Sequence, residues 1–264
     1  MANVARAASK VESERAVELG ARAGYAVSGL LHLLIAAIAL KLAWSGSKTA
    51  ADQSGALQAL AANPLGRLML WVAVVGFTAL AVWQVASAFT SQAARDGSVW
   101  AERGKAVAKA LVYLALAWTS LSFAKGRPRS SRAQSADFTA ALLAHAGGRI
   151  LLSLIGAVIV GVGTYHVMKG WTRKFLQDLS ENPGALATRA GVVGYVAKGA
   201  ALVVVGVLFV AAAVLDSSTK ATGLDGALRT LRRAPMGVFL LTAVALGIAA
   251  YGVYSFARAR FARL

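Results

Sequence analysis

Six long apolar runs constrain this chain more than any other feature of its sequence. Each is at least about 20 residues long, the length that an α-helix needs to cross the hydrocarbon core of a bilayer. The runs are apolar around the whole helix circumference, unlike a soluble amphipathic helix, and they lack the polar–apolar alternation of barrel strands. They therefore predict an all-α integral membrane protein with six transmembrane helices, near residues 21–44, 65–89, 104–124, 148–171, 190–215 and 235–256.

Composition supports a membrane location. Of the 264 residues, 58% are hydrophobic and 15% are charged, whereas soluble domains have roughly 45–50% apolar and about 25% charged residues. A chain of this size cannot bury that surplus in its own core, which excludes soluble Rossmann enzymes, β-sandwiches and disordered tails. The absence of cysteine excludes disulfides, thiolate metal sites and cysteine nucleophiles.

The charge balance is strongly basic, with 28 Lys and Arg against 11 Asp and Glu, a net charge of +17. In a membrane protein, such residues gather at helix ends beside anionic headgroups, so we expect membrane lipids and not nucleic acid as partners. Lys and Arg are more numerous on the side that holds both termini. The positive-inside rule therefore predicts cytoplasmic termini. The first run is too long for a signal peptide, and residues 1–20 are expected to form a cytoplasmic interfacial segment.

An internal repeat divides the chain into three hairpins. Residues 24–29 match 194–199 and, more loosely, 104–109; Gly-Ala-Leu at 55–57 returns at 226–228, and Pro64-Leu65-Gly66 returns as Pro235-Met236-Gly237. A two-helix unit returns the chain to the side of the membrane on which it began, so the three repeats share one orientation. Parallel repeats about a pseudo-threefold axis are therefore expected. The predicted repeats are 21–91, 92–173 and 174–264, and their spans open at Gly24, Gly66, Gly104, Gly148, Gly194 and Gly237.

This three-copy pattern, with its Gly-Tyr openings and Pro-x-Gly entries, resembles the bacterial membrane family known as domain of unknown function 1206. The resemblance covers about residues 22–258; repeat two departs from it at Lys105 and lacks the proline. It implies a small six-helix protein of the bacterial cell membrane, as found in high-GC Gram-positive bacteria. It implies no established activity, cofactor or catalytic residue.

Charged residues inside the runs are few. All 11 acidic residues lie outside the runs or at their ends, which argues against proton or sodium coupling, since a cation crossing a membrane needs a counter-charge. Lys109 and Lys198 lie one to two turns inside the third and fifth runs, at nearly equivalent repeat positions. They are interpreted either as snorkelling lysines or as an anion or lipid-headgroup site. The first repeat has Gly29 and Ser28 there, so the lysines are not a threefold feature.

Two histidines lie within the runs, His32 near mid-span and His166 closer to the cytoplasmic end. A b-type haem needs two histidines at similar depth, and these differ by roughly 8 Å along the helix axis. Hydrogen-bonded packing histidines are the favoured interpretation. No catalytic triad or metal-ligand spacing is visible in the sequence, so no catalytic, cofactor or metal residue is predicted.

An aromatic residue followed by a polar one recurs late in the three even-numbered spans. The two interpretations are an interfacial belt with polar residues bonding across helices, and a ring of mixed polarity around the pseudo-threefold axis. The pairs are Trp83-Gln84, Tyr165-His166 and Tyr254-Ser255.

Glycines and short amphipathic segments complete the pattern. Small residues let membrane helices approach closely, so three sets, Gly24 with Gly29, Gly156 with Gly161 and Gly163, and Gly194 with Gly199, are expected to pack against neighbouring helices. Residues 54–62, 135–146 and 223–233 are predicted to be short helices along the membrane surface. The basic loop 125–132 is interpreted as solvated or as a contact for anionic lipid or envelope polymer.

Together these features favour a non-enzymatic membrane protein that binds lipid or an apolar small molecule, or that scaffolds a membrane complex with protein partners. A passive channel or transporter, with a pathway along the pseudo-threefold axis, is the alternative, and an enzyme is the third possibility. The sequence does not indicate the ligand or the oligomeric state.

Overall fold

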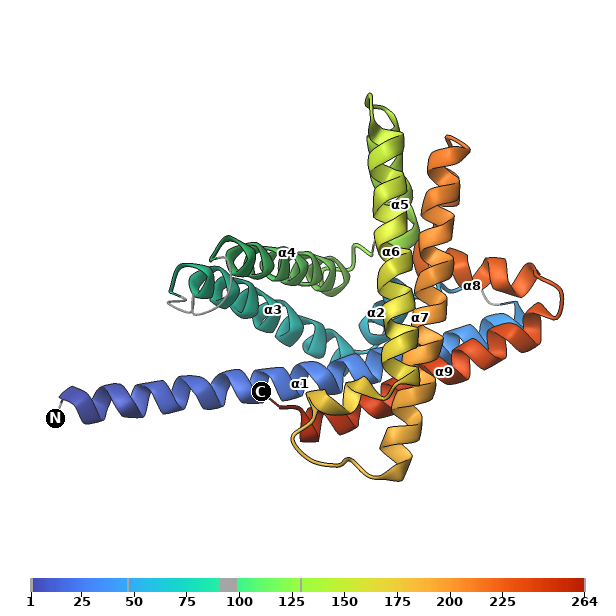
Figure 1. Ribbon diagram of the computed structural model, residues 1–264. Coiled ribbons are helices and arrows are strands. Elements are labelled where there is room, and N and C mark those ends of the chain that lie inside the picture. The colour runs from blue at the N-terminus through green and yellow to red at the C-terminus, as the bar shows by residue number, and fades with distance from the viewer. Residues whose placement is uncertain (1, 47, 91–98, 129, 264) are drawn as a thin grey trace. The chain divides into compact units, whose positions relative to one another are not determined.

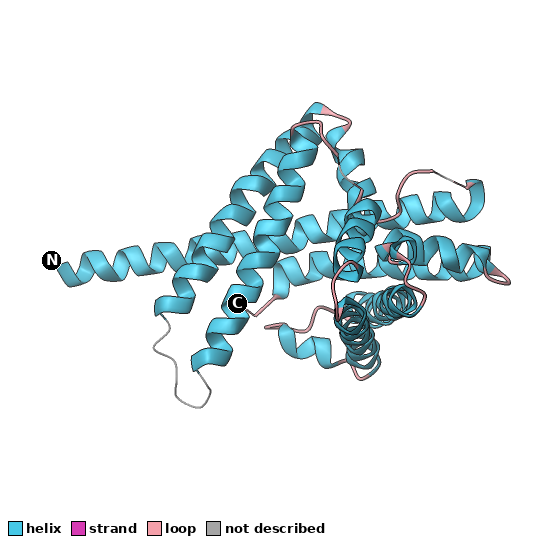
Figure 2. Cartoon of the chain, turned by 90° about the horizontal axis from the view of Figure 1, so that it is seen from above, coloured by secondary structure: helices cyan, strands magenta, loops and turns pink. Residues whose placement is uncertain are grey.

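The computed structural model describes residues 2–46, 48–90, 99–128 and 130–263, which are helical for most of their length (Figure 2). Among these residues six helices are long and apolar enough to cross a membrane. This confirms the prediction of an all-α protein with six spanning helices. They are α1 (Ala2–Ser45), α3 (Pro64–Thr90), α4 (Val99–Ala124), α6 (Gly148–Trp171), α7 (Ala185–Val214) and α9 (Gly237–Phe261).

Short helices precede each even-numbered span. They are α2 (Gln53–Ala61), α5 (Ser131–Leu143) and α8 (Gly223–Arg233), and two 3₁₀ turns, η1 (Lys174–Asp178) and η2 (Ser218–Lys220), lie in other connections. In α8 the buried carboxylate of Asp225 accepts hydrogen bonds from the Ala51 amide (2.8 Å) and from Arg229 (2.9 Å). Arg229 also donates to the carbonyl of Thr49 (3.1 Å). The segment before α2 is thereby fixed to α8.

Three helix boundaries differ from the sequence expectation. Helix α1 begins at Ala2 and continues without a break through residues 2–20 into the first span. Helix α9 begins at Gly237, two residues after Pro235, since Met236 adopts a left-handed backbone with φ 55°. Helix α5 ends at Leu143, before a turn in which Gly147 is left-handed (φ 83°). Helix α3 does begin at Pro64, where Asn63 accepts a hydrogen bond from the Gly66 amide (2.7 Å), as expected of proline in a first helical turn.

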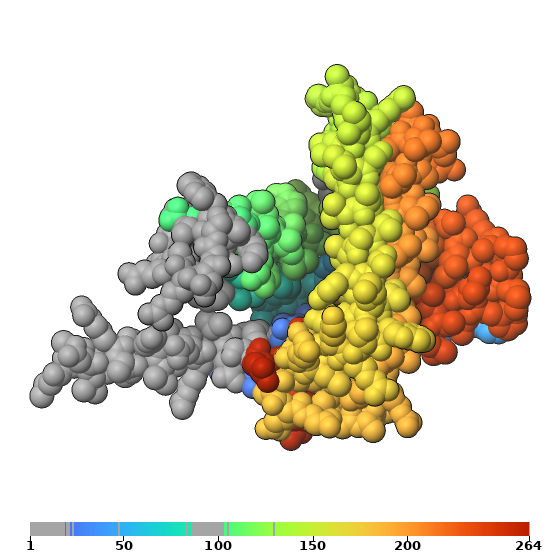
Figure 3. All heavy atoms as spheres, viewed as in Figure 1, coloured from blue at the N-terminus to red at the C-terminus, as the bar shows by residue number. Residues whose placement is uncertain are grey.

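The chain forms two compact units, Met1–Ala56 with Ser130–Leu264, and Leu57–Arg129. In the first unit α6 lies along α7 (Figures 1 and 3) and α1 lies along α9 (Figure 1), and the two pairs cross where α7 meets α9. In the second unit α3 lies along α4. We call the three pairs seams.

The seams follow a cyclic order. In each seam the second spanning helix of one repeat packs on the first spanning helix of the next repeat: α3 on α4, α6 on α7, and α9 on α1. The last repeat therefore closes on the first. This order agrees with the predicted organisation of three equivalent two-helix repeats.

Facing glycines bring the backbones together in the α6·α7 seam. A Cβ atom placed on Gly163 would lie 2.8 Å from the carbonyl oxygen of Gly199, and one on Gly206 would lie 2.7 Å from that of Gly156. Contacts this short leave no room for a side chain, so glycine is required there. Two of the predicted packing glycines are different: Gly24 and Gly161 have open space at the Cβ position, and that expectation was wrong because they lie on the other helix face.

The α9·α1 seam repeats this contact at the equivalent positions. Gly252 aligns with Gly163, and Gly29 aligns with Gly199. Here too each glycine would place a Cβ 2.9 Å from the carbonyl oxygen of the other.

Candidate functional site

Four buried aromatic side chains form a cluster in the first unit. The ring of Tyr195 on α7 lies 5.2 Å from Phe175 of η1, 5.3 Å from Tyr251 and 5.6 Å from Tyr254, the last two on α9. All four residues are at most 5% exposed. The Tyr254 hydroxyl donates to the carbonyl of Phe175 (3.4 Å). We call this set the aromatic cluster.

Two glycines of α7 make space for the aromatic cluster. A Cβ on Gly194 would lie 2.5 Å from the Tyr251 Cα, and one on Gly191 would lie 2.5 Å from the Phe175 ring. The helix backbone therefore forms one wall of the cluster, and α7 and α9 cross at Gly194 with no room for a side chain there.

Two ammonium groups lie over tyrosine rings of the cluster. The Nζ of Lys198 is 4.1 Å from the ring centre of Tyr251, and the Nζ of Lys169 is 5.7 Å from that of Tyr195. Such cation–π contacts stabilise a desolvated cation. Lys169 also forms an ion pair with Asp178 (2.6 Å). No carboxylate among the described residues lies within ion-pair distance of Lys198.

Two half-buried imidazoles flank the lysines. The ring centre of His32 on α1 lies 4.7 Å from Tyr251, and that of His166 on α6 lies 5.8 Å from Tyr195. Each Nδ1 is within hydrogen-bond distance of a carbonyl four residues earlier, 2.6 Å for His32 and 2.8 Å for His166. A carbonyl only accepts, so both Nδ1 atoms carry the proton and both Nε2 atoms are left for other partners.

Lys198 and His32 both lie against the ring of Tyr251. His166 is joined to that ring through Tyr195, so side chains of α7, α1 and α6 meet at the aromatic cluster. We call these three side chains with Tyr251 the Lys198 site. It combines one cation and two imidazoles with an aromatic surface, groups that suit an apolar ligand with an anionic head.

The ring contacts run from His32 to Tyr251, then Tyr195, then His166, so two tyrosine rings stand between the imidazoles in this series. A haem bound by both histidines would instead need the imidazoles to face one another across the iron. The described residues also contain no group of three His, Asp or Glu side chains that could hold a metal ion.

The predicted aromatic–polar pairs have unequal surroundings in the first unit. Tyr254 is fully buried in the aromatic cluster, and Ser255 is 2% exposed and donates to the carbonyl of Tyr251 (2.9 Å). The equivalent Tyr165 is 57% exposed, while its neighbour His166 reaches Tyr195.

The remaining predicted site residues belong to the second unit. Gln84 on α3 is 8% exposed, and Lys109 on α4 is exposed. The side chain of Trp83 lies outside the described residues.

Sequence reasoning missed Tyr195, Tyr251, Phe175 and Lys169 as site residues. A signal was present in the repeats: Tyr195 aligns with Tyr25, the tyrosine of the first Gly-Tyr opening, and Lys169 aligns with Arg258.

The structure repeats that pairing. The Arg258 guanidinium lies 4.2 Å from the ring centre of Tyr25 and donates to its hydroxyl (3.0 Å). The α6·α7 seam and the α9·α1 seam thus share one contact, in which a cation of the second spanning helix of one repeat lies over a tyrosine of the first spanning helix of the next.

Comparison with known families agrees with the repeat boundaries. The family described as Domain of Unknown Function (DUF1206) matches three segments, 23–91, 104–173 and 193–262. The chain belongs to this family. The Lys198 site draws on the first and third DUF1206 segments for three of its residues and on the second for His166.

One curated relative is similar over almost the whole chain. A Bacillus subtilis (strain 168) protein described as "Uncharacterized protein YxxB" is 27% identical over 256 residues, which are 93% of this chain and 91% of that protein. No solved structure matches the chain.

Proposed function

We propose that this multi-pass membrane protein is a non-enzymatic binding protein for an anionic amphiphile, a lipid or an apolar small molecule with an acidic head. The observation that carries the proposal is Lys198, a cation inside the apolar helix α7 without a carboxylate partner among the described residues. An ammonium inside a membrane is costly without a counter-charge. A ligand anion supplies that charge.

The surroundings of Lys198 support the same proposal. The Tyr251 ring at 4.1 Å partly offsets the cost of desolvating the Lys198 ammonium. It leaves the N–H donors of the ammonium available to a ligand. The imidazoles of His32 and His166 offer Nε2 atoms to hydroxyl groups of the head. We place the protein in a bacterial cell membrane with both termini cytoplasmic, so that the ligand is a component of that membrane.

Snorkelling is the competing account of Lys198. A snorkelling lysine extends its stem along apolar surface to the headgroups. Lys198 instead directs its ammonium to a ring of the aromatic cluster, which is buried between α7 and α9. This contact favours a binding role over snorkelling.

The channel alternative has less support. Tyr254 and Ser255 are buried by packing, whereas Tyr165 is exposed. These pairs do not share one surface of the first unit, so we develop the binding proposal instead.

Native mass spectrometry of the protein extracted in mild detergent tests the proposal. We expect wild type to retain one anionic amphiphile, Lys198→Met to lose it, and Lys109→Met to keep it, because Lys109 is the exposed lysine at a nearly equivalent repeat position. Delipidated protein is then titrated with phosphatidylglycerol and with oleic acid to separate a lipid headgroup from a free acid. An adduct that Lys198→Met retains unchanged would refute the proposal, as would a protein that binds neither probe.

A further inference from the structure

The connection between α6 and α7 folds back over the aromatic cluster. It includes η1, which places Phe175 in the cluster with no exposed surface and with its ring stacked on that of Tyr195 at 5.2 Å. Leu179, which is 3% exposed, packs in the same apolar core. We call residues 172–184 the strap. It covers the aromatic cluster at the end where α6 stops and α7 starts.

The strap is fastened at its middle. The carboxylate of Asp178 forms the ion pair with Lys169 on α6 (2.6 Å). A short antiparallel β-bridge also joins the strap to the end of α9 and the residues that follow it. The bridge consists of the facing pair Leu179 and Ala262 and two flanking hydrogen bonds, from the Ser180 amide to the Phe261 carbonyl (2.8 Å) and from the Arg263 amide to the Asp178 carbonyl (3.0 Å).

Left-handed residues lie near both ends of the strap. Arg173 has φ 56° and Gly184 has φ 87°. Glycine adopts this backbone without cost, whereas Arg173 is strained and keeps it only while the surrounding structure holds the strap in place. Loops that open and close turn on a few such positions. The strap therefore has a hinge at each end and a fastening between them.

A continuous series of contacts joins the strap to the Lys198 ammonium. The Phe175 ring stacks on Tyr195, and the Tyr195 ring lies 5.3 Å from that of Tyr251. The Tyr251 ring in turn holds the Nζ of Lys198 at 4.1 Å. Lys198 lies about one turn further into α7 than Tyr195. Lifting the strap would therefore uncover the aromatic rings that stand between the start of α7 and the ammonium.

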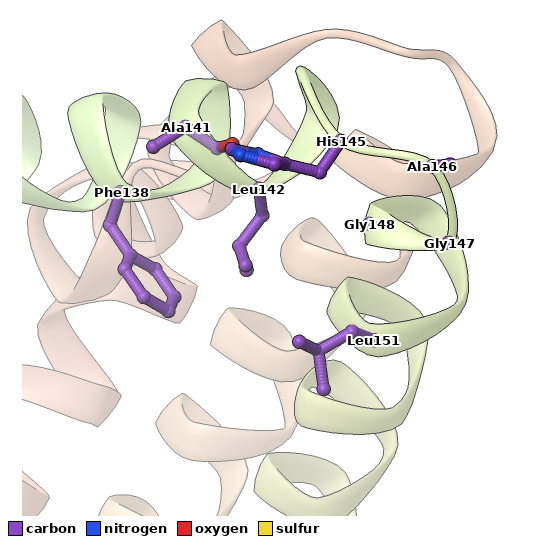
Figure 4. Close-up of a pocket in the computed structure, with 8 residues that line it drawn as sticks. All are labelled: Phe138, Ala141, Leu142, His145, Ala146, Gly147, Gly148 and Leu151. Atoms are coloured by element: carbon purple, nitrogen blue, oxygen red, sulfur yellow. The ribbon is translucent and has the colours of Figure 1, made fainter.

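The groove at the other end of α6 is separate from this arrangement. It has a volume of about 450 Å³ and lies between α5 and the first turn of α6, where Phe138, Leu142 and Leu151 point toward a common space (Figure 4). Leu151 precedes His166 by 15 residues, a distance of about 22 Å along the helix axis. The strap, in contrast, lies directly against the rings that hold the Lys198 ammonium.

We propose that the strap is a lid on the Lys198 site, which lifts from the aromatic cluster before the anionic head of the ligand reaches or leaves the ammonium. This inference rests on the proposed function, because it concerns the same ligand. The docked strap fixes the Tyr195 ring through Phe175 and so keeps the neighbouring Tyr251 in place. The lifted strap lets both tyrosine rings turn. A docked strap therefore retains a bound ligand, and strap opening limits the rate of its exchange.

A disulfide that locks the strap tests the proposal. Leu179 and Ala262 face one another between the two hydrogen bonds of the bridge. The Cα atoms of such a pair lie about 4.5 Å apart, within the range of about 4.4–6.8 Å that a disulfide spans. The chain has no cysteine, so Leu179→Cys combined with Ala262→Cys permits this bond as its one intramolecular disulfide.

The full-length double variant is loaded with deuterated phosphatidylglycerol or deuterated oleic acid in dodecylmaltoside and then oxidised. Unlabelled probe is added, and native mass spectrometry follows the exchange of the bound molecule. We expect exchange to be roughly tenfold slower in the oxidised protein than in the same protein after reduction. The reduced protein is the matched control, because its sequence is identical.

Unfastening the strap should have the opposite effect. Ser180→Pro removes the amide that donates to Phe261, and Leu179 already has the extended backbone that a following proline requires (φ −108°, ψ 146°). Ser180→Ala removes the hydroxyl but keeps the amide. The Ser180 side chain is exposed, so neither change alters the core. We expect several-fold faster probe exchange in Ser180→Pro and a rate close to wild type in Ser180→Ala.

Hydrogen–deuterium exchange of peptides from 172–184, measured without a probe, shows whether each variant moves the strap as intended. It should fall in the oxidised double variant and rise in Ser180→Pro. Equal probe exchange in the oxidised and reduced protein, or in Ser180→Pro and Ser180→Ala, despite these changes would overturn the lid and leave the proposed function standing. Failure of wild type to bind either probe would overturn both, so the two failures are distinguishable.

Discussion

The α6·α7 seam and the α3·α4 seam occupy the same place in the repeat but pack in different ways. In α6·α7 the carbonyl of Gly199 would meet a Cβ on Gly163 at 2.8 Å. The equivalent residues of α3·α4 are Ala81, which is 2% exposed, and Lys109, which is exposed. There the rings of Phe77 and Tyr113 stack at 6.3 Å.

The two seams differ in what holds their helices together. Apolar burial contributes little to association between helices in lipid, so van der Waals contact between close backbones has to hold a seam together. Glycine at intervals of seven residues (Gly156, Gly163, Gly170) gives α6 one continuous close face. Helix α3 has no such face, because Ala81 stands at the position of Gly163 and Gly76 has open space at its Cβ position. Residues 57–129, which include α3 and α4, form a unit of their own.

The largest expected effect is that of Gly163→Leu. The new side chain would have to displace the Gly199 carbonyl and the Val203 backbone amide, each 2.8 Å from the Cβ position. Overpacking costs about 1–3 kcal/mol where side chains can adjust, and backbone adjusts less, so we expect a loss of about 3 kcal/mol. The measurement is SDS-induced unfolding in dodecylmaltoside, followed by circular dichroism.

Gly161→Leu is the matched control, since it makes the same change two residues away, where a Cβ meets no atom within 4 Å. It should change the unfolding free energy by less than about 0.5 kcal/mol. Equal losses in the two variants would contradict close backbone packing as the basis of the seam.

A smaller effect is expected at the contact of Arg258 with Tyr25. Arg258→Met removes a cation 4.2 Å from the ring centre and a 3.0 Å hydrogen bond to the hydroxyl. Cation–π contacts contribute about 0.5–2 kcal/mol. We expect a coupling of about 1 kcal/mol in a double-mutant cycle with Tyr25→Leu.

The control cycle replaces Arg258→Met by Arg260→Met, an exposed guanidinium over a ring of its own helix, Phe261. Its coupling to Tyr25 should be near zero. A coupling of the same size in both cycles would mean that net charge at the end of α9, and not the contact across the seam, stabilises the protein.

Much of this fold follows from the sequence for simple reasons. Hydrophobic length determines the spans, and recurring Gly and Pro positions determine the repeats, so both were predicted. The partner of each span was not predicted, because apolar faces of similar helices are nearly interchangeable until individual glycines are placed in contact. Gly161 and Gly163 illustrate this: they are two residues apart, yet only Gly163 packs.

The candidate site could be predicted from the sequence only in part, for the same reason. Lys198 and His166 were identified as polar exceptions within apolar runs. Tyr195 and Tyr251 resemble ordinary interfacial aromatics until α7 and α9 cross at Gly194 and bring their rings within 5.3 Å. Such a cluster depends on tertiary crossing, which no local pattern encodes.

The smallest expected effect is that of Gly→Ala, and its sign should differ between Gly76 on α3 and Gly206 on α7. Alanine forms helix more readily than glycine by up to about 1 kcal/mol. Gly76→Ala, in open space on α3, should therefore raise the unfolding free energy by a few tenths of a kcal/mol. Gly206→Ala on α7 should lower it, because its methyl group would lie 2.7 Å from the Gly156 carbonyl and from the Val160 amide. The same SDS titration resolves the two directions.

The sign is more informative than the size. Both substitutions add one methyl group to a spanning helix, so their effects on propensity and hydrophobicity are the same, and only the facing helix differs. If Gly76→Ala were as destabilising as Gly206→Ala, Gly76 would have to pack against another element instead of facing open space. Opposite signs would show that glycine is required only where a facing helix meets it.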